Sequence, residues 1–219
     1  MTLELIQDLA DSRMAGKDPE EAEVLFRKAI DLSEVRFGRD NPVFLTAQKN
    51  FSDFLLDSGR PVEAEAVLLG AEERLEALVS PGNGDLMDLR MNLVEALLDQ
   101  GKEAEAVEKL QGILLHIRNN LYLLDQVAWT IVRPGHPLPP LFQDGLDLAR
   151  KALEMSSAGR RSFHRETLAW AMFANGKFEE TVRQADLALE EAAGEDKDDY
   201  TDLPGEIRKA IQEEKTSKE

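Results

Sequence analysis

The sequence predicts an all-α solenoid of about five helical hairpins, closed by a C-terminal capping helix. The first observation behind this prediction is a repeat. A turn followed by a small residue on an apolar helical face recurs at Ala22, Ala64 and Ala106, at intervals of 42 residues. Weaker copies are centred on Gly145 and Thr181. Matched spacing in several segments indicates a repeat architecture, in which each unit buries its apolar face against its neighbours.

The second observation is that each unit reads as two helices joined by a tight turn. In the second unit, "PVFLTAQKNFSDFLLD" (42–57) precedes Gly59, which can end a helix in a left-handed conformation. The next helix places Ala64 and Ala71 on one apolar face, two turns apart. Because small side chains allow a neighbouring helix to approach closely, bulk at either position is expected to disturb the stack.

The linkers follow the same plan. "FGRDNP" (37–42) and "VSPGNGDL" (79–86) separate units, and "VRPGHPLPPLF" (132–142) predicts a stiff, exposed loop inside the fourth unit.

The repeats are expected to fill residues 1–190, and an apolar helix is expected to begin almost at Met1. Residues 191–219 are expected to form an acidic linker and a capping helix with one apolar stripe, made by Leu203, Ile207, Ala210 and Ile211. The expected units are about 2–40, 41–82, 83–118, 119–158 and 159–190.

Composition narrows the possible partners. The chain has 43 acidic and 26 basic residues, for a formal charge of −17. This balance disfavours nucleic acid and anionic membranes and favours basic or neutral partners. The sequence has no Cys, which excludes disulfides and thiolate sites. There is no secretory signal pattern, and no apolar run approaches the roughly 20 residues of a membrane span. A soluble, cytoplasmic protein is expected.

No catalytic motif is found. His116, His136 and His164 lack the spacing of a zinc-binding helix, and each is interpreted as a surface or packing residue. The glycines form neither a P-loop nor a dinucleotide fingerprint. The sequence therefore predicts a protein that is not an enzyme, without a metal or cofactor.

The hairpin pattern resembles the tetratricopeptide repeat (TPR), and in the N-terminal half it is similar to the 42-residue repeats of kinesin light chains. The residues that carry this resemblance are "NFS" (50–52), Gly59, Ala64 and Ala71, their copies "NLV" (92–94), Gly101 and Ala106, and the run from Glu34 to Pro42. "VAW" (127–129) and "LAW" (168–170) resemble a TPR style of large bacterial repeat proteins. Thr181 departs from the pattern, which expects a small apolar residue there.

The resemblance implies a right-handed superhelix whose concave wall, made by the first helix of each hairpin, holds an extended or helical peptide. The groove-facing residues that it implies are Thr46, Lys49, Asn50, Asp53 and Asp57, then Asp88, Met91, Asn92, Glu95 and Asp99, then Tyr122, Gln126, Trp129 and Arg133, and finally Glu166, Thr167 and Trp170.

Alternative roles stay open for three parts of this set. Asn50 and Asn92 can bridge the backbone of a peptide, or they can bond a neighbouring helix. Trp129 and Trp170 are the two tryptophans of the chain, and they can anchor a ligand or fill the core. The acidic residues can attract a basic segment, or they can form a solvated surface.

The expected function is noncatalytic protein binding, as a scaffold or adaptor. The alternatives are a regulatory or sensor segment of a larger signalling protein and a self-associating repeat protein. The oligomeric state is open between monomer and homodimer.

Overall fold

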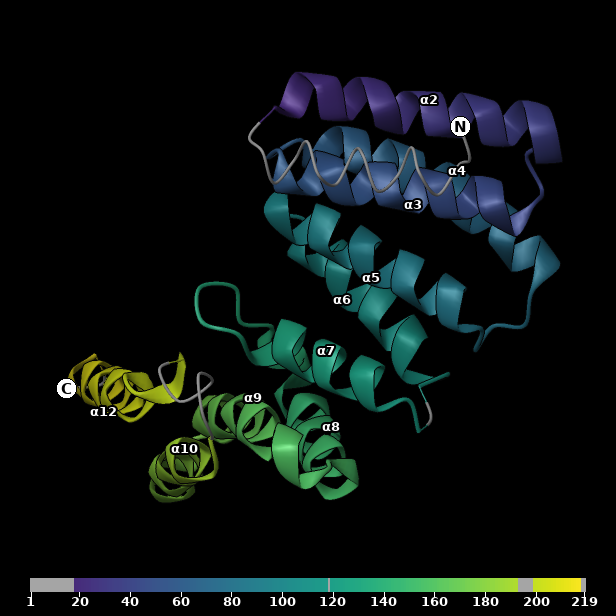
Figure 1. Cartoon of the computed structure of the whole chain (residues 1–219). Coiled ribbons are helices and arrows are strands. Elements are labelled where there is room, and N and C mark those ends of the chain that lie inside the picture. Colours follow the sequence, from purple (N-terminus) through teal and green to yellow (C-terminus); the bar gives the residue numbers. More distant parts are fainter. Residues whose placement is uncertain (1–17, 118, 193–198, 218–219) are drawn as a thin grey trace. The chain divides into compact units, whose positions relative to one another are not determined.

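A computed structural model describes residues 18–117, 119–192 and 199–217 (Figure 1). Within these ranges every regular element is a helix, as predicted. None of the described helices is long and apolar enough to cross a membrane. The chain divides between His116 and Ile117 into two compact units. The helix expected near Met1 lies outside the described residues.

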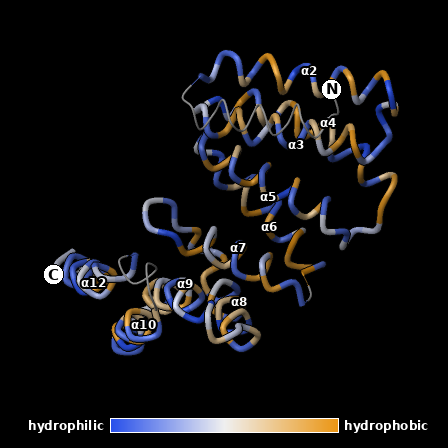
Figure 2. The backbone as a smooth tube through the Cα atoms, in the orientation of Figure 1, coloured by the Kyte–Doolittle hydropathy of each residue, from blue (hydrophilic) through white to orange (hydrophobic). Residues whose placement is uncertain are grey.

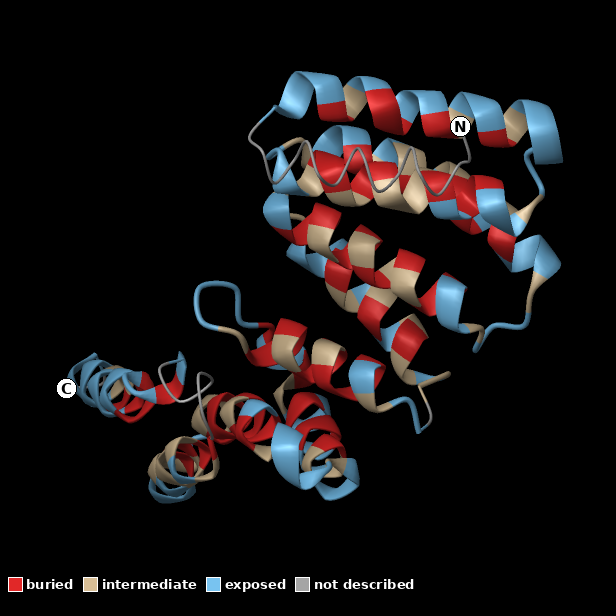
Figure 3. Ribbon diagram, viewed as in Figure 1, coloured by how far each residue is buried: buried red, intermediate tan, exposed pale blue. Residues whose placement is uncertain are grey.

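The first unit is a stack of antiparallel helical hairpins. Its helices are α2 (Pro19–Phe37), α3 (Pro42–Asp57), α4 (Pro61–Leu78), α5 (Gly84–Asp99) and α6 (Glu103–Leu114). Each helix packs against the next one along the chain, and α3 also packs against α5. Hydrophobic positions form stripes along these helices, and buried residues alternate with exposed ones around each (Figures 2 and 3).

The second unit is built in the same way. Its helices are α7 (Leu121–Val132), α8 (Phe142–Met155), α9 (Arg161–Ala174), α10 (Phe178–Glu191) and α12 (Leu203–Thr216), with short 3-10 turns at Pro139–Leu141 and Ala158–Arg160. Helix α7 packs against α8 and α9, and α10 packs against α9 and α12. Of the apolar stripe predicted for the capping helix α12, Leu203, Ile207 and Ile211 are buried, which confirms these three positions, and Ala210 is half-buried.

Three hairpins share one turn geometry. Gly59, Gly101 and Gly176 have φ angles of 68°, 71° and 70°. In each turn the N–H after the glycine donates to a carbonyl five residues earlier, which is the Schellman arrangement. These bonds are Arg60 to Leu55 at 2.8 Å, Lys102 to Leu97 at 2.9 Å, and Lys177 to Met172 at 2.9 Å. The left-handed conformation predicted for Gly59 is therefore confirmed, and a residue with a Cβ would be strained there.

The small residues of the repeat lie at the packed centre of each hairpin. Ala22, Ala64, Ala106 and Thr181 are 0% exposed, and Gly145 is also buried. The predicted role of this position in close helix packing is confirmed. Thr181 fits because its hydroxyl donates to the carbonyl of Lys177 at 2.9 Å, so that its polar group is satisfied within its own helix.

Gly145 lies in a close contact between α7 and α8. A Cβ on this residue would lie 2.9 Å from Ile131 Cγ2 and 3.0 Å from Val132 Cγ1, both on α7. These are branched side chains of limited rotamer freedom. The α7–α8 contact therefore requires glycine where the other hairpins use alanine or threonine.

An asparagine caps the first helix of three hairpins. The side chains of Asn41, Asn83 and Asn120 accept hydrogen bonds from the backbone N–H groups of Val43 at 2.9 Å, Leu86 at 3.1 Å and Leu123 at 3.2 Å. Asparagine is among the best residues at this position. These caps were not predicted from the sequence, although Asn41 and Asn83 are 42 residues apart.

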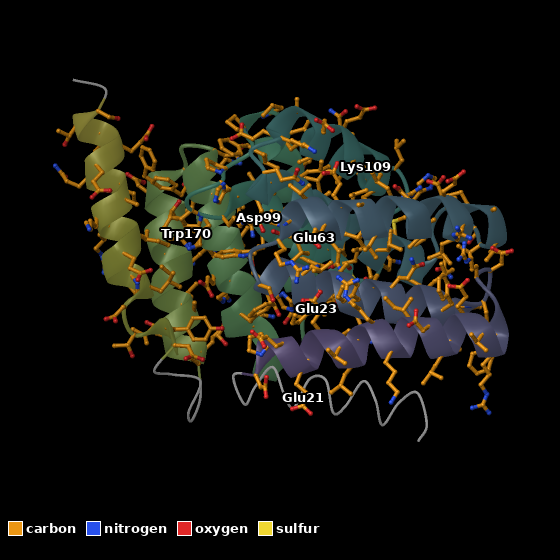
Figure 4. The ribbon with its side chains drawn as sticks, turned by 90° about the horizontal axis from the view of Figure 1, so that it is seen from above. Glu21, Glu23, Glu63, Asp99, Lys109 and Trp170 are labelled. Atoms are coloured by element: carbon orange, nitrogen blue, oxygen red, sulfur yellow. The ribbon has the colours of Figure 1, made fainter. Side chains whose placement is uncertain are left out.

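Ion pairs join consecutive hairpins in the first unit. Arg60 Nη1 donates to Glu23 Oε2 at 2.7 Å, and Lys102 Nζ donates to Glu65 Oε2 at 2.7 Å, one repeat later. Arg60 also binds Glu63, and Figure 4 labels Glu23 and Glu63 on α2 and α4. The hydrogen bond from Arg60 lowers the pKa of Glu23, and the one from Lys102 lowers the pKa of Glu65. In both pairs, the glutamate that follows the small packed residue binds the basic residue that follows the turn glycine of the next hairpin.

The proline-containing loop differs from its prediction. Its prolines are exposed, but Leu138 and Leu141 are buried. The N–H of Leu138 donates to the carbonyl of Ile131 at 2.9 Å, which pins the loop to the end of α7. The expectation of an exposed loop is wrong for these two leucines, because burying their side chains outweighs the solvation of the segment.

Candidate functional site

A small cleft lies between α3 and α5 in the first unit. Its volume is about 230 Å³, and its lining includes the predicted residues Lys49, Asn50 and Asp88. Burial raises the pKa of Asp88, Lys49 opposes this shift, and Asp85 and Asp53 reinforce it. The cleft is therefore an acidic site with a single lysine among its lining residues.

Asn92 bonds a neighbouring helix. Its side-chain Nδ2 donates to the carboxylate of Asp53 on α3, and Lys49 Nζ donates to the second oxygen of that carboxylate at 3.1 Å. Asp53 therefore joins α3 to α5. This contact is the alternative that the sequence left open for Asn92. Asn50, its counterpart one repeat earlier, lines the cleft.

The expected groove position of Met91 is wrong. Its side chain is 0% exposed. Helix α5 is covered by α3, α4 and α6, so only a narrow face of it reaches solvent, and Met91 lies outside that face. Glu95 is half-buried and Asp57 and Asp99 are exposed, and none of the three lines the α3–α5 cleft.

A larger cavity lies between α7 and α9 in the second unit. Its volume is about 720 Å³, and it brings together the predicted residues Gln126, Trp129 and Glu166. We call it the α7–α9 cavity. It is lined by Leu121, Tyr122, Asp125, Gln126 and Trp129 from α7, by Ser157 and Arg160 from the preceding turn, and by Phe163, His164, Glu166 and Thr167 from α9.

Aromatic side chains are prominent in this lining. Tyr122 is 65% exposed and Phe163 is 47% exposed, while Trp129 is half-buried. Sequence reasoning included Tyr122 and Trp129 but missed Phe163. The signal was present, since Phe163 follows Tyr122 by 41 residues, the same interval that separates Trp129 from Trp170.

A buried hydrogen bond joins the two walls of the cavity. His164 Nδ1 lies 2.9 Å from Asp125 Oδ1, and the two side chains are 5% and 6% exposed. The ring of Phe163 meets that of His164 edge to face, with centroids 5.3 Å apart. His164 is therefore a packing residue that positions the aromatic wall. Sequence reasoning missed Asp125, although an acid inside the apolar helix "LYLLDQVAWTIV" was a usable signal.

Glu166 lies in a negative environment. Burial raises its pKa, and Glu206, Asp125 and Asp199 raise it further. The neighbouring base Arg165 is directed to α10, where its Nε donates to Glu191 at 2.7 Å. The carboxyl group of Glu166 is thus half-buried next to other acids.

Trp170 and Arg133 are separated from this cavity. Trp170 is 7% exposed and packs edge to face on Phe173, with ring centroids 5.7 Å apart. Both predicted residues line a second cavity, of about 540 Å³, which Glu213 of α12 also borders. Figure 4 shows Trp170 on α9, next to α12. The structure therefore does not join Trp129 and Trp170 in one pocket.

Comparison with solved structures identifies the fold. TPR-like repeats of a Podosopora anserina kinesin light chain share 18% identity with this chain, with a TM-score of 0.69 over 86% of this chain and 94% of that one. YrrB, a TPR protein with an unusual peptide-binding site, shares 15% identity at a TM-score of 0.56, covering 93% and 90%. A thermophilic TPR protein of Thermus thermophilus shares 18% at a TM-score of 0.57, covering 96% and 100%.

No protein-family profile and no curated protein matches the chain. At identities below 20% the structural likeness is one of fold. It agrees with the hairpin turns, the small packed residues and the capping helix described above. The chain therefore has the tetratricopeptide-repeat fold, with likeness both to kinesin light chain repeats and to bacterial TPR proteins.

Proposed function

We propose that the protein is a noncatalytic interaction module, a scaffold or adaptor, that holds a peptide segment of a partner protein in the α7–α9 cavity. The observation that carries this proposal is the cavity itself, of about 720 Å³ with Tyr122, Trp129 and Phe163 in its walls. Its volume is in the range of ligand sites. Aromatic residues contribute much of the binding energy at protein interfaces.

The exposure of two of these rings supports the proposal. Tyr122 and Phe163 present large apolar surfaces to solvent, and they come from two helices that face one cavity. Clustered exposed apolar surface is typical of an interaction site. YrrB, which has the same fold, is described as having a peptide-binding site of its own.

The α3–α5 cleft is a second proposed contact surface. Asn50 and Asp88 line it, and the surrounding Asp53 and Asp85 favour a basic segment through electrostatic attraction. Its volume of about 230 Å³ is enough for a single side chain rather than a continuous peptide. We therefore assign the main binding role to the α7–α9 cavity.

A displayed peptide library provides the test. Peptides selected on the full chain are measured against the variants Tyr122→Ala and Phe163→Ala. The matched control is Phe37→Ala, which removes an aromatic ring that is 43% exposed in the first unit. We expect the selected peptides to bind at least about tenfold more weakly to both cavity variants, and unchanged to the control.

Two outcomes would contradict the proposal. Selected peptides that bind both cavity variants at full affinity would place the binding site elsewhere. A dimer in light scattering that dissociates in Tyr122→Ala would show that a second copy of the chain occupies the cavity. Circular dichroism of each variant checks that the helices remain folded.

A further inference from the structure

The α7–α9 cavity combines aromatic walls with a carboxylate. Tyr122, Trp129 and Phe163 line it together with Glu166, which is half-buried. The face of an aromatic ring attracts a cation that lies within about 6 Å of its centre, and the attraction grows when water is excluded. A carboxylate in the same wall adds a direct partner for positive charge.

The charged groups around Glu166 are mainly acidic, and two of the nearby arginines are paired with another acid. Glu206 of α12, Asp125 of α7 and Asp199 all act against its ionised form. On α9, Arg161 and Arg165 lie 3.5 Å and 2.7 Å from the carboxylate of Glu191 on α10. Arg160 is the basic residue among those that line the cavity, and it is exposed in the turn before α9. A cationic ligand would therefore relieve repulsion between acids.

Gln126 adds a hydrogen-bond acceptor. Its side-chain oxygen is buried and has no hydrogen-bond partner among the described residues, and other atoms of the residue line the cavity. A buried acceptor without a donor costs free energy, which an N–H group of a ligand would recover once the Gln126 amide rotates toward the cavity. The wall thus offers a carboxylate, and an amide oxygen after this rotation, to a ligand that carries several donors.

We propose that the α7–α9 cavity binds an arginine side chain of the partner, with the guanidinium between Glu166 and Gln126 and stacked on an aromatic ring. This inference rests on the proposed peptide-binding function. A guanidinium is planar, always charged, weakly hydrated and rich in N–H donors, and it stacks on aromatic rings. A lysine ammonium is a compact, strongly hydrated point charge, so the cavity should prefer arginine.

The test uses single-residue probes on the full chain labelled with ¹⁵N. N-acetyl-arginine amide is titrated and compared with the matched amides of citrulline, which is neutral and similar in shape, and of norleucine, which is apolar. The chain has two tryptophans, so two indole N–H signals are expected, and the variant Trp129→Phe assigns them. The arginine probe should shift the Trp129 signal and leave that of Trp170 in place.

Affinity then separates charge recognition from apolar burial. We expect citrulline amide to bind at least about tenfold more weakly than arginine amide, because the charge-assisted hydrogen bond is lost. Glu166→Gln should reduce the affinity for arginine amide by a similar factor. Glu154→Gln, which removes an exposed acid of α8 outside the cavity, should leave it unchanged.

The outcomes distinguish the two proposals. Equal binding of norleucine and arginine amides would overturn arginine recognition and leave an apolar peptide site. The absence of any Trp129 shift at the solubility limit of the arginine probe would overturn it as well. If library peptides still lose affinity in Tyr122→Ala, the proposed function stands in both cases. If they do not, the proposed function fails by its own test.

Discussion

Glu65 on α4 accepts a hydrogen bond from Lys102 at the turn of the next hairpin, at 2.7 Å, and Glu23 does the same for Arg60 one repeat earlier. The glutamate of each pair directly follows the small packed residue of its hairpin. The base of each pair directly follows the turn glycine. One short sequence pattern therefore sets both the packing within a hairpin and the register between hairpins.

The Glu65–Lys102 pair should contribute modestly and in a pH-dependent way. The two side chains are 16% and 35% exposed, so we expect a coupling energy below about 1 kcal/mol in a double-mutant cycle of Glu65→Gln and Lys102→Met. Lys102 lowers the pKa of Glu65 below its ordinary value of 4.5. The contribution is thus present above that value and is lost as pH falls through the lowered pKa.

Urea unfolding of the four proteins at neutral and at acid pH measures this coupling. A coupling energy that stays the same well below the lowered pKa would show that the pair is not electrostatic in origin.

Replacing Gly145 with alanine should destabilise the protein despite the higher helix propensity of alanine. The new Cβ would lie 2.9 Å from Ile131 Cγ2, so α8 or α7 must shift, at a cost of about 1–3 kcal/mol. The control is Gly70→Ala in α4, where a Cβ meets nothing within 4 Å, and we expect a gain of roughly 0.5–1 kcal/mol there. Thermal and urea unfolding measure both. Changes of the same sign would contradict this account of the α7–α8 contact.

Neutralising Glu166 should stabilise the fold at neutral pH. Its pKa is raised by burial and by neighbouring acids, so the folded state favours the protonated form. The cost is therefore present above the raised pKa and disappears as pH falls through it. Because the side chain is partly exposed, we expect Glu166→Gln to gain less than about 1 kcal/mol. The melting temperatures of the two proteins should converge in acid, and a difference that widens in acid would contradict the prediction.

Removing Asp125 should damage both stability and binding. Its carboxylate is the partner of buried His164, and Asp125→Ala leaves that ring without its hydrogen bond, at a cost of about 2–3 kcal/mol. Asp125→Asn keeps an oxygen that can accept from the ring and should cost less. Urea unfolding, together with peptide binding, compares the two. Equal losses would show that packing volume, rather than the hydrogen bond, is what Asp125 provides.

The repeat positions could be predicted because each one requires a particular type of residue, which recurs at a fixed interval in the sequence. Small residues such as Ala64 and turn glycines such as Gly59 are required by helix contact and by backbone conformation, and both leave a periodic trace. The C-terminal cap was predictable for the same reason, from one apolar stripe.

The residues of the site were harder to predict because their exposure depends on how much of each helix is buried by neighbouring helices. Met91 and Trp129 both lie on first helices of their hairpins, yet Met91 is fully buried and Trp129 is half-buried at a cavity. Trp170 matches Trp129 in sequence but lines a different cavity, bordered by α12. Residues at the same repeat position thus meet different neighbours, and the pairing of Asp125 with His164 leaves no periodic trace.

The two ion pairs between hairpins, Glu23–Arg60 and Glu65–Lys102, also imply that the first unit could accept an additional hairpin. Val107 of α6 holds the position that Glu23 and Glu65 hold in the earlier hairpins, so the series of glutamates ends at Glu65 on α4. A second copy of residues 60–101 inserted after Gly101 would place an arginine opposite Glu65 and a new glutamate opposite Lys102. Every junction would keep its pair, and the stack would lengthen by one whole hairpin of 42 residues.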